Sequence, residues 1–110
     1  MAERGKHKFW YTATGSNATV KAGSGSLYSI NVSPGQGSTV VLVDANASLG
    51  AAPNLNSDSL TGLIGRVGPY STSSNGTAPN PDIIAFSGLG FNDGLVIAAT
   101  SNARLLVEYE

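Results

Sequence analysis

Alternating apolar and polar residues predict β-strands along much of this chain. In residues 27–32, Tyr28, Ile30 and Val32 alternate with polar or smaller side chains, so they share one face of an extended segment. This pattern predicts a strand with one buried and one solvated face, and it places Tyr28 on the buried face.

A second segment, residues 39–44 (TVVLVD), is apolar at successive positions and therefore on both faces. It predicts a central strand that is covered on both sides. The connecting residues 33–38 contain Pro34 and two glycines, which favour a turn. The sequence therefore predicts that the two strands form a hairpin.

The C-terminal region repeats this organisation. Residues 94–100 and 103–109 are apolar runs with only a serine and an asparagine between them, which predicts a tight hairpin. Alternation in the last run places Arg104 and Glu108 on one face, close enough to pair, with Ala103, Leu105, Val107 and Tyr109 inward. Leu106 lies between the two charges on the outward face, so we expect it to contact another subunit.

The rest of the chain favours short strands and two long loops. No segment shows the helical apolar periodicity with caps, and long loops in compact domains are usually functional or mobile. The fold class predicted is all-β, an antiparallel β-sandwich, jelly-roll-like or Greek key, with long middle loops. Further strands are expected in residues 9–14, 19–21, 60–67 and 82–86, and the loops in residues 46–59 and 68–81.

The composition excludes several kinds of stabilisation and chemistry. Only 12% of the 110 residues are charged, against roughly 25% in an average globular domain, and the chain has no cysteine. Disulfides, thiolate metal sites and cysteine nucleophiles are therefore absent. A small domain without such links gains stability from packing or association, and we expect a homotrimer or another small ring.

Charge is distributed unevenly along the chain. Arg4, Lys6 and Lys8 supply half of the six basic residues, whereas the remaining residues carry three basic and six acidic side chains. This divides the chain into a basic N-terminal arm, residues 1–8, and a single β-sandwich domain, residues 9–110. The acidic body predicts no nucleic-acid partner. No apolar run approaches the roughly 20 residues of a membrane span, and no signal-peptide core follows the N-terminus, so we expect no membrane partner.

An aromatic triplet follows the arm directly and has two interpretations. It forms either the first strand or an anchor with which the arm docks on an acidic partner, and in the second case Trp10 contributes most. If Trp10 instead belongs to the core of its own chain, its removal unfolds the protein. The candidate partner-binding residues are Arg4, Lys6, Lys8, Phe9, Trp10, Tyr11 and Leu106.

Catalytic and metal-binding patterns are not found. The single histidine, His7, lies in the basic arm outside the predicted sandwich, where a catalytic triad is not expected. The aspartates at positions 44, 58, 82 and 93 are scattered singly, without the spacing of a calcium loop. We therefore expect no enzyme, no cofactor and no metal.

Four segments together resemble a known family. Residues 20–32 (VKAGSGSLYSINV), 39–44 (TVVLVD), 94–100 (GLVIAAT) and 103–110 (ARLLVEYE) look like motifs of the small β-sandwich virion proteins of tailed bacteriophages. The resemblance covers about half of the chain, at both ends, and the long middle of residues 45–81 departs from the shorter members.

The resemblance implies a structural role on a virion assembled in the host cytoplasm. The expected function is decoration or cementing of the capsid, in which an oligomer binds the major capsid protein or another virion protein and stabilises the assembled shell. The alternative is a head-fibre, tail or receptor-binding component whose loops recognise a host glycan. A carbohydrate-binding module outside any virion is a further alternative, but the long loops offer only Tyr70 as an aromatic platform.

Overall fold

The computed structural model describes residues 7–12, 17–50, 54–57, 59–70, 80–100 and 103–110. Its regular elements are all β-strands, and the described residues contain no helix. The eight strands are β1 (Lys8–Thr12), β2 (Asn17–Ala22), β3 (Gly25–Ser33), β4 (Val40–Val43), β5 (Leu63–Val67), β6 (Asp82–Phe91), β7 (Gly94–Ala99) and β8 (Arg104–Tyr109).

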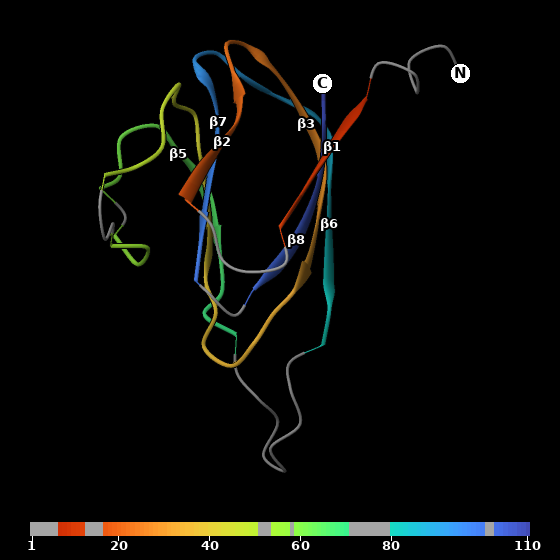
Figure 1. Cartoon of the computed structure of the whole chain (residues 1–110), viewed down its shortest axis with the longest axis vertical. Helices are drawn as coiled ribbons and strands as arrows, with labels where there is room; N and C mark the ends of the chain where they lie inside the picture. Colours follow the sequence, from red (N-terminus) through yellow and green to blue (C-terminus); the bar gives the residue numbers. More distant parts are fainter. Residues whose placement is uncertain (1–6, 13–16, 51–53, 58, 71–79, 101–102) are drawn as a thin grey trace.

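The strands form two four-stranded antiparallel sheets that pack face to face (Figure 1). The strand orders are β1-β8-β3-β6 and β2-β7-β4-β5. Strands β4 and β5 pair at the centre of the sequence, and β3 with β6, β2 with β7 and β1 with β8 pair around them. This nested pairing, rolled into two sheets, is the jelly-roll arrangement. The predicted all-β sandwich is confirmed.

Both predicted hairpins are wrong. The connection at residues 33–38 leads from β3 in one sheet to β4 in the other, and β7 and β8 also lie in different sheets. Among the eight described strands, only β4 and β5 are consecutive in sequence and paired with each other. A short linker rich in glycine, proline or serine can turn a chain within one sheet or carry it between two sheets. Local sequence does not distinguish the two, because long-range pairing decides which occurs.

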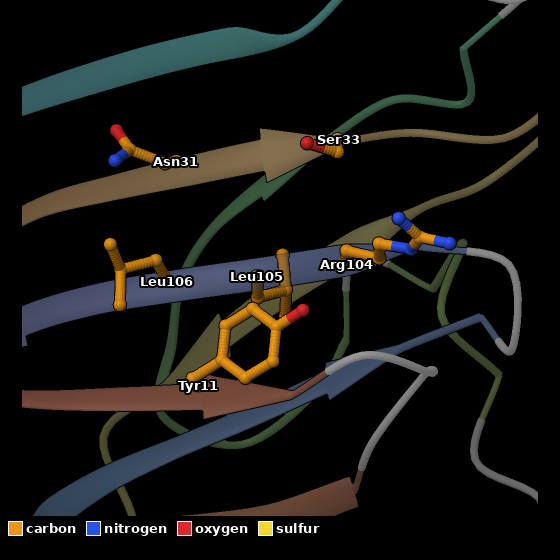
Figure 2. Close-up of a pocket in the computed structure, with 6 residues that line it drawn as sticks. All are labelled: Tyr11, Asn31, Ser33, Arg104, Leu105 and Leu106. Carbon is orange, nitrogen blue, oxygen red and sulfur yellow. The ribbon is translucent and has the colours of Figure 1, made fainter.

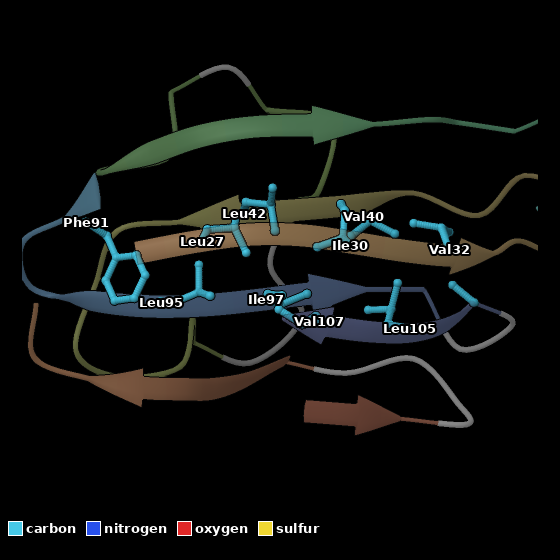
Figure 3. Packing of buried hydrophobic residues seen from close by; sticks show 11 residues of the cluster. Leu27, Ile30, Val32, Val40, Leu42, Phe91, Leu95, Ile97, Leu105 and Val107 are labelled. Carbon is cyan, nitrogen blue, oxygen red and sulfur yellow. The ribbon is translucent and has the colours of Figure 1, made fainter. Parts of the chain in front are cut away.

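The main core lies between the sheets (Figure 3). Each sheet directs alternate side chains into this layer, as sheet packing requires. Trp10 and Tyr109 pack against it from β1 and β8. The buried members are Leu27, Ile30, Val32, Val40, Leu42, Phe91, Leu95, Ile97, Ala103, Leu105 and Val107.

A second, smaller cluster covers the other face of the β2-β7-β4-β5 sheet. Its buried residues are Val41, Val43 and Val96, and leucines from the segment between β4 and β5 pack over them. Asn17 holds part of this segment: its side-chain amide donates to the Leu49 carbonyl at 2.6 Å and accepts from the Leu49 N–H at 2.8 Å. The two-sided burial predicted for residues 39–44 is therefore confirmed. Part of the first long loop packs over the outer side of this strand.

A β-bulge changes the facing of β3. Leu27 pairs with Tyr109 and Ser29 with Glu108, so Tyr28 is an extra residue on β3. Leu27 takes the buried position, and Tyr28 turns to the outer face. The prediction that placed Tyr28 inward is wrong, because strict alternation does not allow for the extra residue.

Asp44 fixes the turn between β6 and β7. Its carboxylate accepts the backbone N–H groups of Asn92 at 2.9 Å, Asp93 at 2.8 Å and Gly94 at 3.2 Å. These bonds stabilise the charged form and lower the pKa of Asp44, although partial burial opposes the shift. Asp44, the residue after β4, therefore holds the β6–β7 turn in place.

Candidate binding face

The outer face of the β1-β8-β3-β6 sheet carries a row of side chains aligned across all four strands. Tyr11 of β1 is opposite Leu106 of β8, Leu106 is opposite Asn31 of β3, and Asn31 is opposite Ile83 of β6. Because the buried residues of these strands occupy the alternate positions, this row points away from the core. The structure therefore places Leu106 on the outer face, as the sequence predicted.

Three side chains on this face are large, apolar and exposed. Phe9 and Tyr11 are each 61% exposed, and Ile83 is 73% exposed. Phe9 lies next to Glu108, one row from Tyr11. Exposed apolar groups gathered on one face are typical of an interaction surface, whereas scattered single residues are not. We call Phe9, Tyr11, Leu106, Asn31 and Ile83 the binding face.

An open hollow of about 240 Å³ lies beside this row (Figure 2). The ring of Tyr11 flanks it, Arg104 lies at one end, and Asn31 and Ser33 border it from β3. The lining therefore combines an aromatic ring and leucine side chains with an amide, a hydroxyl and a guanidinium group.

The sequence-predicted arm residues divide into three groups. Arg4 and Lys6 lie outside the described residues. Lys8 is the first residue of β1 and is exposed. Trp10 faces inward and packs against the main core of its own chain, the alternative to an anchor role. The exposed aromatic side chains of β1 are Phe9 and Tyr11, not Trp10.

His7 lies on the sheet surface and has partners there. Its ring stacks on Tyr28 with centroids 4.1 Å apart, and Nδ1 lies 2.6 Å from a carboxylate oxygen of Glu108. The Tyr28 hydroxyl donates to Glu110 at 3.1 Å, and this hydrogen bond raises the pKa of Tyr28. Glu108, which the sequence paired with Arg104, lies within hydrogen-bond distance of His7 in the structure.

Tyr70, near the start of the second long loop, is held in place by hydrogen bonds. The Tyr70 hydroxyl donates to Asp82 at 3.0 Å, and its backbone N–H donates to the Ser38 carbonyl at 3.0 Å. Partial burial and the Asp82 carboxylate raise the pKa of Tyr70 to about 12. Its ring packs against the main core and is not an open platform.

The described residues contain no cluster of metal-ligating side chains. No three His, Asp or Glu side chains of this part of the chain come together in a way that could hold a metal ion. Within the same residues, no helix is long and apolar enough to cross a membrane.

Sequence reasoning missed Asn31 and Ile83 as parts of the binding face, and it placed Arg104 on the outer face without giving it a binding role. In residues 82–86 of the structure, exposed and half-buried positions alternate and Ile83 is exposed, whereas the sequence places two isoleucines side by side. Only the pairing register brings Ile83 into line with Leu106, and that register joins segments far apart in the sequence. Comparison of the chain with family models, curated proteins and solved structures finds no match.

Proposed function

We propose that this chain is a non-enzymatic structural protein of a tailed-bacteriophage virion, which decorates or cements the capsid. The observation that carries the proposal is the binding face, a set of exposed aromatic and aliphatic side chains on one sheet. On the opposite outer face of the sandwich, the chain itself covers Val41, Val43 and Val96. The open sheet therefore remains available to the major capsid protein or another virion protein.

The residue types on the binding face suit a protein partner. Aromatic side chains contribute much of the energy in protein interfaces, often about 2 kcal/mol or more when a hot-spot residue is removed. Phe9 and Tyr11 present this kind of side chain, and Leu106 and Ile83 extend the apolar row. Arg104, at the end of the hollow, provides a cation for a carboxylate of the partner.

The basic arm supplements this surface in the proposal. Arg4, Lys6 and Lys8 meet carboxylates on the partner, and exposed ion pairs of this kind contribute about 1 kcal/mol or less each. They steer and orient the chain, whereas apolar burial provides most of the affinity. A subunit that binds only the assembled shell lowers the free energy of that state by mass action.

The experiment is a copy-number measurement on purified virions from the source culture. Quantitative mass spectrometry after gradient purification gives the ratio of this chain to the major capsid protein. Decoration of the shell requires hundreds of copies per particle. Tens of copies favour the head-fibre, tail or receptor-binding alternative, and absence from the particles contradicts a virion role.

A further inference from the structure

The sandwich has four edge strands in its described part, and they differ in how they are protected. Natural edge strands avoid pairing with other chains by being short or by carrying lysine, proline or other charges. Strands β1, β2 and β5 are five or six residues long and carry Lys8, Lys21 and Arg66 respectively. Strand β6 is ten residues long and contains no lysine, arginine or proline.

The first half of β6 is regular and apolar. From Asp82 to Ala85 it pairs residue by residue with β3, and the register shift comes after Ala85. Ile83 and Ala85 are exposed on its outer face, whereas Ile84 packs against the main core. The one charged group, Asp82, accepts a hydrogen bond from Tyr70.

We propose that residues 82–86 of β6 pair antiparallel with the same residues of a second copy of this chain. A two-fold axis at Ile84 would place Ile83, the most exposed large apolar side chain of the described residues, beside Ala85 of the second copy on the same face of the sheet. Each Asp82 would lie opposite Phe86 of the other copy. The two Asp82 carboxylates would then be separated by about 14 Å along the strands, so no like charges meet.

A second copy is the occupant that this strand fits best, because antiparallel pairing around a two-fold axis makes a strand its own complement. The joined sheets would form one eight-stranded sheet with two binding faces on the same side. This inference does not depend on the virion role. It differs from the homotrimer expected from the sequence, because an isologous contact closes with two copies.

The test is analytical ultracentrifugation of the full chain across a micromolar concentration series. We expect a mass twice that of the 11.1 kDa chain. Ala85→Lys places a charge at the centre of the contact and is expected to raise the dimer dissociation constant at least about tenfold. Phe9→Lys is the matched control, since it places the same charge at an exposed position of the opposite edge strand and should leave the dimer intact.

Several results would overturn the inference. They are a monomer at every concentration, a mass of three copies, or a dimer that Phe9→Lys dissociates and Ala85→Lys does not. Circular dichroism verifies that both variants keep the strand spectrum of the parent. Hydrogen exchange gives a second measurement, because the amides of residues 82–86 should gain protection as the protein concentration rises.

Discussion

Single residues connect distant strands in this fold, and Asp44 is the clearest case. Its carboxylate joins the end of β4 to the turn between β6 and β7 through three backbone N–H groups. The nearby Gly62 and Gly94 let the backbone approach closely: a side chain on Gly62 would collide with the Asp44 carbonyl, and one on Gly94 with the Ala45 carbonyl. The corner depends on a charge and on two residues without a Cβ atom.

We expect Asp44→Asn to lower the thermal midpoint at neutral pH, because it removes the charge that the three N–H groups stabilise. The pKa of Asp44 is lowered in the folded chain, so its contribution is present above its ordinary value of 3.8. That contribution is lost as the pH falls through the lower folded value. The difference between parent and variant should therefore narrow in acid. Asp93→Asn is the control, because it removes a carboxylate of the same turn and keeps the three bonds. Equal midpoints for the parent and Asp44→Asn at neutral pH would contradict this role.

Tyr70 should make the stability depend on alkaline pH. Its folded pKa is about 12, against 10.0 ordinarily, so the folded chain favours the neutral phenol. The stabilising contribution of Tyr70 is fully present below pH 10. It is lost as the pH rises from about 10 to 12, because Tyr70 ionises at a lower pH in the unfolded chain than in the folded chain. Denaturant unfolding at several alkaline pH values measures this decline. Tyr70→Phe should reduce its slope, and an unchanged slope would show that Tyr70 is not the cause.

At the scale of the strands, sequence reasoning succeeded where one segment carries its own pattern. Residues 39–44 are apolar on both faces and predicted that β4 is buried on both sides. The alternation around Leu106 predicted that this side chain points outward. It failed where a second segment decides the outcome. The bulge at Tyr28 and the crossing of residues 33–38 between sheets both depend on partners dozens of residues away. The sequence named Phe9, Tyr11 and Leu106 but not Asn31 and Ile83, because Ile83 joins the binding face only through its pairing with β3.

Replacing isoleucine with alanine should destabilise the fold much more between the two sheets than on the outer face. Ile97 is completely buried between the sheets, whereas Ile83 is 73% exposed. We expect Ile97→Ala to lower the free energy of unfolding by about 2–5 kcal/mol, because it leaves a cavity in the core. Ile83→Ala should lower it by less than about 1 kcal/mol, since it loses only strand propensity and surface packing. Denaturant unfolding measures both, and similar losses would contradict the assignment of the two faces.

For the molecule as a whole, the nested pairing makes most contacts non-local. The outermost pair, β1 with β8, joins the two ends of the chain, and His7 contacts Glu108 across 101 positions. Such a topology requires long loops to close before the pairing energy is gained. It also leaves the two outer faces unequal, one covered by the segment between β4 and β5 and the other open.

We therefore expect slow folding, with refolding in milliseconds to seconds, as in other β-sandwiches. The single tryptophan, Trp10, lies on β1 against the core, so its fluorescence reports when the outermost pair has formed. Stopped-flow refolding from denaturant gives the rate. Complete recovery of the signal within microseconds would contradict this topology.

The proposed attachment through the binding face is tested most directly by measuring how variants bind to virions from which the chain has been removed. The triple variant Phe9→Ser, Tyr11→Ser, Leu106→Ser should reduce the bound copies at least about tenfold at equal concentration, because it removes the apolar part of the binding face. Leu89→Ser is the matched control: Leu89 is also exposed, at 38%, but lies outside the row. If the triple variant is folded and binds as well as the control and the parent, the open sheet is not the attachment surface.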